Sequence, residues 1–205
     1  MLQVYGDLGS GNCLKVKYIA DATGTPYVWH EVKARSGGTK TPEYLALNPS
    51  GEMPVVVLDD GRPLAQSNAI LRYLARGSRF IPADAYDAAK VDEWLFWEQY
   101  SHEPTVAVAR ARVHYDKVAI ADLDPALMAR ANKALDRLEQ ALTGRTFLVG
   151  DTISIADIAL MPYTRSAPEG GLDLTGRPAL LRWIAACEHE LGLSAAAAEL
   201  GAHHG

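Results

Sequence analysis

The sequence predicts an α/β domain with the element order βαβαββα, followed by an all-helical domain. Strand-like and helical patterns alternate up to about residue 77, and an Asp-Gly pair at residues 60–61 predicts a hairpin that makes the sheet mixed. Strand signals then disappear. We expect the first domain to span residues 1–77, a linker 78–86 and the helical domain 87–205.

The first half of the α/β domain is predicted to be a βαβ unit. Residues 2–5 alternate in hydropathy and form a strand that ends in a glycine-rich loop, residues 6–11. The next strand is the aromatic and β-branched run 27–32. A helix stopped by Gly24 and Pro26 separates the two strands, and its apolar residues are spaced four apart: Leu14, Tyr18 and Ala22.

The second half of this domain supplies a short helix, a hairpin and a final helix. Residues 42–47 suggest the short helical segment, and residues 54–58 are a buried-strand run. The turn at residues 59–61 leads into a strand over 62–65. Ser67 is a suitable cap for the final helix, whose expected buried face is Ile70, Tyr73 and Leu74.

The helical domain is predicted from the spacing of its apolar residues. Val91, Trp94, Leu95 and Glu98 show helical spacing, and Pro104 should break or kink this helix. A long helix is expected over residues 126–142, with its apolar residues at Leu127, Ala131, Leu135, Leu138 and Leu142.

Composition favours small molecules as ligands. The chain has 205 residues, 48% of them hydrophobic, and a net charge of -5, so it lacks the basic field that attracts nucleic acid or anionic membranes. The two cysteines, Cys13 and Cys187, supply neither a disulfide scaffold nor a four-cysteine zinc site, and they fit a reducing cytoplasm. We expect no metal, no membrane segment and no export signal, and a solvated tail at His203-His204.

Ser10 and Asn12 are the first candidates for chemistry. They lie at the start of the first helix, where backbone N–H groups and the helix dipole stabilise a thiolate. A serine cannot exchange disulfides, but its hydroxyl can donate to the thiolate of a bound thiol cofactor, and Asn12 offers amide donors beside it. The alternative is that both residues only cap the helix. Cys13 is expected to be a buried small hydrophobe.

Two further segments carry candidate binding residues. Pro54 heads a strand at an edge, and a cis bond there would turn the backbone of Met53 outward to pair with an extended peptide. The alternative is that Pro54 simply begins an edge strand. Gln66 and Ser67 lie at another helix N-terminus, which can bind a carboxylate. For Ser67 the alternative is a plain N-cap.

Together, three segments resemble the glutathione site of the cytosolic glutathione S-transferase superfamily, of a bacterial serine-type, theta-like or nu-like kind. They are residues 10–13, 48–54 and 66–70. The resemblance implies a thioredoxin-like first domain and a helical-bundle second domain. Residues 152–159 are similar to the family's capping box with its hydrophobic staple, in which Ser154 caps, Asp157 reaches back and Ile153 packs on Ile158.

The resemblance also implies roles for single residues. Ser10 would activate the thiolate, and Asn12 matches the asparagine of the nu-like class. The γ-glutamyl end of glutathione would be held by Gln66 and Ser67, and its cysteinyl backbone by Met53 before a cis Pro54. Thr39 or Lys40 would lie near the glycyl carboxylate. Two departures are visible: Tyr5 lies within a strand and is no activating tyrosine, and many bacterial relatives have glutamate where this chain has Gln66.

Glutathione is therefore the expected co-substrate, with three possible functions. The first is attack of its thiolate on a hydrophobic electrophile, and the second is reduction of a disulfide or peroxide with two glutathiones per site, as in the nu-like class. The third is a non-catalytic interaction module. The family forms homodimers, here with Trp97, Gln99, His102 and Glu103 as candidate interface residues. Candidate walls for the second substrate are Trp94, Trp97, Tyr100, and Tyr115 or Tyr163.

Overall fold

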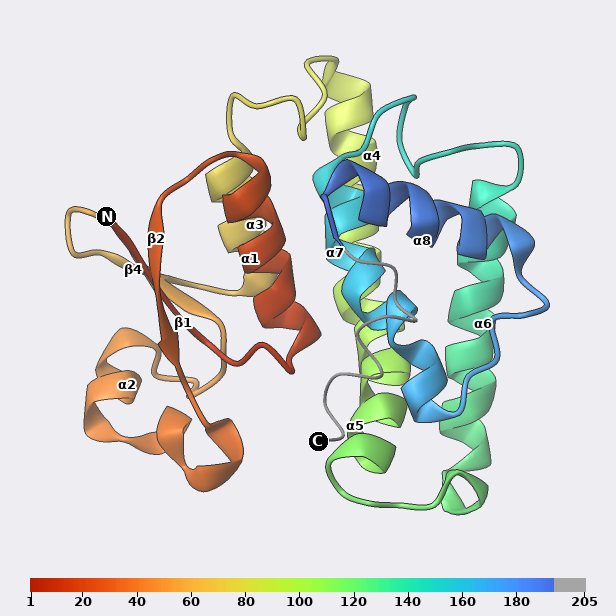
Figure 1. Cartoon of the computed structure of the whole chain (residues 1–205), viewed down its shortest axis with the longest axis horizontal. Coiled ribbons are helices and arrows are strands. Elements are labelled where there is room, and N and C mark those ends of the chain that lie inside the picture. The colour runs from red at the N-terminus through yellow and green to blue at the C-terminus, as the bar shows by residue number, and fades with distance from the viewer. Residues whose placement is uncertain (194–205) are drawn as a thin grey trace. The chain divides into compact units, whose positions relative to one another are not determined.

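The computed structural model describes residues 1–193 and divides into two compact units, Met1–Ile81 and a second that begins at Pro82. The first unit is thioredoxin-like, with the predicted order of strands and helices, and the second is helical, so the predicted fold class is confirmed. Figure 1 labels the helices and strands of both units.

A four-stranded mixed sheet in the order β2-β1-β3-β4 forms the centre of the first unit. Its strands are β1 (Leu2–Gly6), β2 (Tyr27–Glu31), β3 (Val55–Val57) and β4 (Pro63–Ala65). Strand β1 runs parallel to β2 and antiparallel to β3, and β3 pairs with β4 as the predicted hairpin. Only the β1–β2 connection therefore needs a crossover helix.

Two helices cover one face of the sheet and a third covers part of the other face. Helices α1 (Gly11–Ala22) and α3 (Ser67–Ala75) lie side by side in Figure 1, and α2 (Pro42–Leu47) lies across the sheet from them. Successive residues of a strand point to opposite faces. Val4 of β1 therefore joins the core below α1 and α3, whereas Tyr5 packs with Tyr44 of α2.

The buried faces of the two helices differ from the predicted spacing. In α1 the fully buried apolar residues include Val16 and Ile19, and Ala22 is exposed. In α3 Ile70 is buried as expected, but Leu71 takes the buried position that was expected of Tyr73. Each helix packs against both the sheet and the other helix, so its apolar stripe is broader than a single four-residue spacing.

The second unit begins with a long helical segment that contains Pro104. It consists of α4 (Ala85–Trp97), a π-helical segment η3 (Glu98–Ala107) and α5 (Val108–His114). The helical segment continues through Pro104, so the expected break is wrong, but the α-helix gives way to the π-helical segment η3 around this residue. The wider π-helical turn accommodates a residue that lacks an N–H and whose ring crowds the preceding turn.

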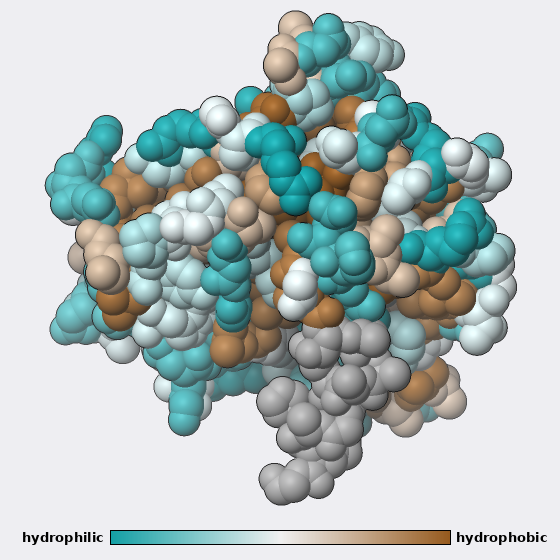
Figure 2. Space-filling model, turned by 45° about the horizontal axis from the view of Figure 1, so that its top comes forward, coloured by the Kyte–Doolittle hydropathy of each residue, from teal (hydrophilic) through white to brown (hydrophobic). Residues whose placement is uncertain are grey.

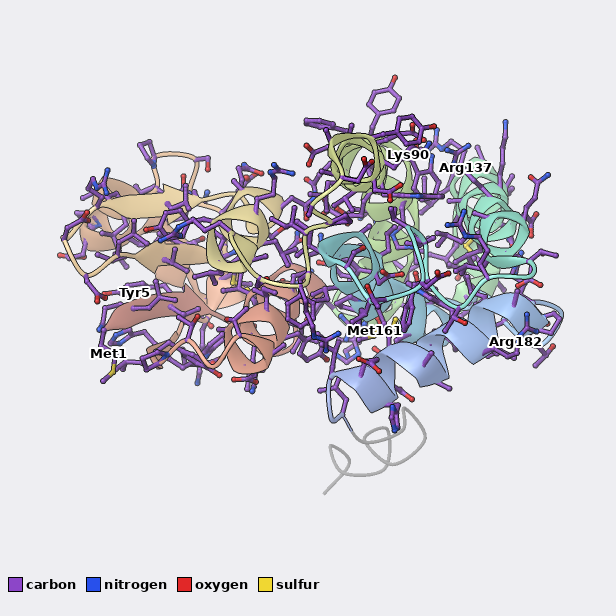
Figure 3. The ribbon with its side chains drawn as sticks, turned by 90° about the horizontal axis from the view of Figure 1, so that it is seen from above. Met1, Tyr5, Lys90, Arg137, Met161 and Arg182 are labelled. Carbon is purple, nitrogen blue, oxygen red and sulfur yellow. The ribbon has the colours of Figure 1, made fainter. Side chains whose placement is uncertain are left out.

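Within residues 1–193 the bundle also contains the helices α6 (Pro125–Leu142), α7 (Ile155–Arg165) and α8 (Pro178–Glu190). Met161 of α7 is fully buried, and the guanidinium of Arg137 on α6 lies 5.2 Å from the ring centroids of both Trp94 and Trp97 on α4 (Figure 3). The expected apolar face of α6 is buried, because Leu127, Ala131, Leu135, Leu138 and Leu142 all lie in the core.

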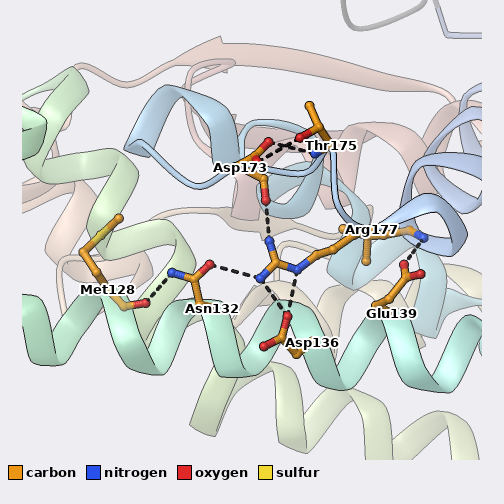
Figure 4. Close-up of polar contacts among 8 residues, drawn as sticks. Met128, Asn132, Asp136, Glu139, Asp173, Thr175 and Arg177 are labelled. Carbon is orange, nitrogen blue, oxygen red and sulfur yellow. Dashed lines mark hydrogen bonds and ion pairs between the residues drawn. The ribbon is translucent and has the colours of Figure 1, made fainter.

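Polar contacts fix the start of α8 on α6. Both carboxylate oxygens of Glu139, which Figure 4 labels, accept backbone N–H groups, from Ala179 at 3.0 Å and from Leu180 at 2.7 Å. A carboxylate in this place satisfies N–H groups that have no partner within the helix and complements its dipole. Arg177 adds a contact to Asp136 of α6 at 2.7 Å.

Ser154 and Asp157 form the predicted capping box at the start of α7. Ser154 accepts from the backbone of Ala156, and the Asp157 carboxylate accepts the backbone N–H of Ser154 at 2.9 Å. Asp157 is fully buried, and burial raises the pKa of its carboxyl while hydrogen bonds from Leu148, Trp183 and Ser154 oppose that shift. The carboxylate thus joins the loop before α7 to α8.

On the face drawn in Figure 2, apolar residues reach the surface in patches between hydrophilic side chains. Within residues 1–193, none of the helices combines the length and the apolar character that a membrane crossing requires. The residues His203-His204, expected to form a solvated tail, lie outside the described part of the chain.

Candidate functional site

The strand register brings the predicted site residues to one end of the sheet. Tyr5, near the end of β1, pairs with Val55 at the start of β3, and Val55 also pairs with Ala65 at the end of β4. The loop after β1 holds Ser10, the residues before β3 are Met53-Pro54, and the residue after β4 is Gln66. Three segments from different parts of the sequence therefore meet at this end of the sheet.

Ser10 occupies the N-cap position of α1, but its hydroxyl makes no capping hydrogen bond. Its backbone carbonyl accepts N–H groups from Cys13 and Leu14 at 3.0 and 2.9 Å, which starts the helix without the side chain. The alternative that the Ser10 side chain serves only as a cap is therefore not what the structure shows. Its hydroxyl lies at the positive end of the helix dipole, where a negative charge is stabilised.

Asn12 and Ser67 join the starts of α1 and α3. The Ser67 hydroxyl donates to Oδ1 of Asn12 at 3.1 Å, across 55 residues of sequence. Next to it, Nζ of Lys15 lies 3.5 Å from Oδ1 of Asn68. The two helix N-termini, each with a positive dipole end, thus lie together and favour a bound anion between polar donors.

The structure corrects the role of Ser67 at the start of α3. Gln66, not Ser67, is the N-cap residue, and Ser67 is the first helical residue with 5% of its surface exposed. Gln66 has φ of 69°, in the left-handed region that residues with a Cβ rarely adopt. A positive φ at a residue with a Cβ is typical of ligand-binding sites, and here it sets the direction of the chain between β4 and α3.

The segment before β3 contains a cis peptide bond between Met53 and Pro54, as the resemblance implied. The expected edge location is wrong, because β3 is an inner strand that pairs with both β1 and β4. Met53 is half-buried against the core that contains Tyr44 and Val55. Lys40, from the short 3₁₀ turn Gly38–Lys40, contacts the same segment, because its ammonium donates to the carbonyl of Gly51 at 3.1 Å. Thr39 in that turn is buried, with 4% of its surface exposed.

Cys13 is buried beneath this site and is not suited to act as a nucleophile. None of its surface is exposed, and burial raises the pKa of its thiol from 9.0 to about 11, although hydrogen bonds from Asp7 and Ser10 oppose the shift. A thiol with this pKa is almost wholly protonated at neutral pH. The expectation of a buried hydrophobe is confirmed, and a thiolate at this site has to come from a ligand.

Sequence reasoning gave no role to Tyr44, which the structure connects to the site. Its phenol donates to the backbone carbonyl of Glu52 at 2.9 Å, directly before Met53. No motif marks this contact, because the acceptor is a backbone group that any residue at position 52 would supply. Asn48, which was noted as part of a motif, donates to the same carbonyl at 2.8 Å.

In the helical unit, the aromatic residues predicted to wall a substrate site divide by burial. Trp94 and Tyr163 are in the core, whereas Tyr100 has 88% of its surface exposed. His102 was expected at an interface or on the surface, and this is wrong: it is fully buried and its Nε2 lies 2.9 Å from the Thr164 hydroxyl. Within residues 1–193, no group of three or more His, Cys, Asp or Glu side chains is arranged to hold a metal ion.

Comparison with known proteins agrees with this geometry. The family model for the glutathione S-transferase N-terminal domain matches residues 9–76, and the model for the C-terminal domain matches residues 105–190. The structure of a glutathione S-transferase from Pseudomonas fluorescens Pf-5 is 45% identical in sequence, with a TM-score of 0.87 over 90% of this chain and 92% of that one.

Two other relatives bear on the chemistry. A glutathione transferase from Burkholderia graminis, solved with two glutathione molecules bound per subunit, is 29% identical, with a TM-score of 0.79 over 93% of this chain and 87% of that one. The disulfide-bond oxidoreductase YfcG of Escherichia coli is 30% identical over 75% of this chain and 74% of its own length. On the matches to both domains, together with the fold, the chain belongs to the cytosolic glutathione S-transferase superfamily.

Proposed function

We propose that this protein binds glutathione at the joined starts of α1 and α3 and activates its thiol for attack on a hydrophobic electrophile. The observation that carries the proposal is the hydrogen bond between Ser67 and Asn12, which brings two helix N-termini together beside Ser10. The bound tripeptide would place its γ-glutamyl carboxylate at Gln66 and Ser67, its cysteinyl backbone at Met53 and its glycyl carboxylate near Thr39 or Lys40. Solved relatives that contain glutathione support this ligand.

The activation needed is modest. A free thiol with a pKa near 8.5 becomes mostly ionised at neutral pH if the site lowers that pKa by about two units, roughly 2.7 kcal/mol. A charge-assisted hydrogen bond contributes about 1.5–3 kcal/mol and a helix N-terminus about 0.3–1 kcal/mol. The Ser10 hydroxyl and the start of α1 can therefore supply the shift without a second charged group. Cys13 cannot replace the glutathione thiol, because it is buried and protonated.

The thiol pKa of bound glutathione tests this mechanism directly. We expect ultraviolet absorbance of the thiolate to titrate about two pH units lower in the complex than in free glutathione. Ser10→Ala should abolish most of this shift and lower the rate of conjugation to an aryl halide at pH 7 by about twentyfold, because the thiolate fraction falls as the pKa rises. Ser36→Ala, at an exposed serine of the same unit, is the matched control. An unchanged titration in Ser10→Ala would remove Ser10 from the mechanism.

A second function, glutathione-dependent reduction of disulfides, is favoured by Asn12 and by the similarity to a disulfide-bond oxidoreductase. The first glutathione thiolate would attack a substrate sulfur and release one thiol, and a second glutathione would attack the mixed disulfide to give oxidised glutathione and the other thiol. Calorimetry should then find two glutathiones per subunit. Turnover of 2-hydroxyethyl disulfide should persist in Cys13→Ser and be lost in Asn12→Ala.

Glutathione binding itself separates both enzymes from a third possibility. If the wild-type protein binds no glutathione at millimolar concentration, neither reaction can take place at this site. A non-catalytic interaction module on the same fold would then be the remaining function.

We also propose that the protein is a homodimer that uses the exposed side of the helical segment after residue 84. Phe96 and Tyr100 are four residues apart in that segment and have 76% and 88% of their surfaces exposed. Two large aromatic side chains so exposed and so close are typical of an interaction surface. Light scattering should give the mass of a dimer, and the double variant Phe96→Ser, Tyr100→Ser should give a monomer.

A further inference from the structure

Two buried side chains hold the backbone carbonyl that directly precedes Met53. The carbonyl oxygen of Glu52 accepts the phenol of Tyr44 at 2.9 Å and the Nδ2 amide of Asn48 at 2.8 Å. Tyr44 and Asn48 have only 5% and 7% of their surfaces exposed. A backbone oxygen with two side-chain donors fixes the orientation of the peptide group between Glu52 and Met53, because that group is planar.

The donors themselves are fixed in place. Oδ1 of Asn48 accepts both the backbone N–H and the hydroxyl of Ser50, at 3.2 and 2.8 Å, which determines the direction of its amide group. Tyr44 packs in the core with Val32 and Val55 on the α2 side of the sheet. Burial, with a smaller contribution from Cys13, raises the pKa of the Tyr44 phenol well above its ordinary value. The phenol therefore keeps its proton, and stays a hydrogen-bond donor, at neutral pH.

The same turn is held from a second side by Lys40. Its ammonium donates to the carbonyls of Ser50 and Gly51, at 3.4 and 3.1 Å. Gly51 has φ of 62°, in the left-handed region that favours glycine, and a Cβ on it would lie 3.0 Å from the backbone oxygen of Thr39. The carbonyls of residues 50–52 therefore all accept bonds from side chains of this unit.

We propose that Tyr44 and Asn48 are positioning residues for glutathione: through the Glu52 carbonyl they hold the backbone of Met53 in the orientation that pairs with the cysteinyl part of the tripeptide. This inference rests on the proposed function and adds the residues that shape its peptide-binding strand. Neither side chain touches the reacting sulfur in this arrangement. Their loss therefore weakens the binding of glutathione in the ground state and the transition state alike, without changing the chemical step.

Tyr44→Phe is the sharpest test, because it removes one hydroxyl and keeps the ring that fills the core. We expect the Kd and the KM for glutathione to rise about three- to tenfold, the range that one lost hydrogen bond gives, with kcat unchanged at saturating glutathione. Tyr27→Phe is the matched control: it removes a phenol that donates to Asp21 in the same unit, at the opposite end of the sheet. Its Kd should equal that of the wild type.

A second variant keeps the test decisive if Tyr44→Phe folds poorly. Asn48→Asp retains an oxygen for both Ser50 donors and removes the N–H group that reaches Glu52. It should weaken glutathione binding at least as much as Tyr44→Phe. Both donors act on one carbonyl, so their effects on the Kd should not be independent. The Kd of the double variant should therefore differ from the value obtained by multiplying the two single effects.

The outcomes separate this inference from the proposed function. A wild-type protein that gives no calorimetric signal with glutathione contradicts the proposed function. A wild-type protein that binds glutathione, together with Tyr44→Phe and Asn48→Asp variants that bind it equally well, overturns the inference and leaves the function standing. A fall in kcat with an unchanged KM also overturns it, because the residues would then act on the chemical step.

Discussion

Asp157→Asn should destabilise the helical unit although it changes a single atom. One carboxylate oxygen accepts the backbone N–H of Leu148 at 2.9 Å and the indole N–H of Trp183 at 2.8 Å. The other accepts the backbone N–H of Ser154 at 2.9 Å and its hydroxyl at 3.0 Å. An asparagine has one oxygen and one NH₂ group, which cannot accept, so one pair of donors must lose its acceptor.

The cost follows from which pair is lost. The better orientation keeps the oxygen on Leu148 and Trp183 and turns the NH₂ group toward Ser154, whose hydroxyl can accept from it. One buried N–H is then left without a partner, which costs about 1–3 kcal/mol, and two charge-assisted bonds become neutral ones, which costs about 1 kcal/mol each. Removing a buried charge offsets part of this, since burial disfavours the ionised carboxyl. We expect a net loss of about 2–4 kcal/mol.

Thermal and urea unfolding followed by circular dichroism measure this loss. For a chain of 205 residues, about 2–4 °C per kcal/mol gives a decrease in Tm of roughly 5–15 °C. Asp122→Asn, at an exposed aspartate of the same unit, should stay within about 0.5 kcal/mol of the wild type. If Asp157→Asn changed stability no more than this control, the four hydrogen bonds would not contribute as the structure indicates.

Four further predictions concern the first unit and α8. Neither Cys13 nor Cys187 should react with a thiol reagent at pH 8 until the protein is unfolded, since both are buried. Stability should fall between pH 9 and 11, because the unfolded thiol of Cys13 loses its proton first, and it should fall less steeply in Cys13→Ala, where the buried Cys187 thiol still acts in the same direction. Gly6→Ala would place a Cβ 2.8 Å from the Cys13 sulfur and should cost about 1–3 kcal/mol in melts, partly restored by Cys13→Ala. Glu139→Ala should lower the free energy of unfolding measured in urea by about 1–2 kcal/mol, whereas an unchanged midpoint would contradict its capping role.

The order of elements could be read from the sequence because the signals for it are local. Alternating and helical spacings, the Asp-Gly turn and the Ser154 capping box each involve residues within one strand, turn or helix end. Pro104 shows the limit of such signals. Whether a helix ends at a proline or widens around it depends on the packing of the neighbouring helices, which periodicity does not encode.

The sequence by itself determined which segments carry the candidate site, since each lies at the start of a helix or a strand with recognisable small, amide or proline residues. Only the tertiary structure decided how these residues are used. In the tertiary structure, Ser67 donates a hydrogen bond to Asn12, and Gln66 is the N-cap residue of α3. His102 is buried, and Tyr44 donates to the Glu52 carbonyl. These outcomes depend on which hydrogen-bond partners the packing of the sheet and helices brings within about 3 Å of each other. The partners are far apart in the sequence, so no local sequence pattern indicates which of them will meet.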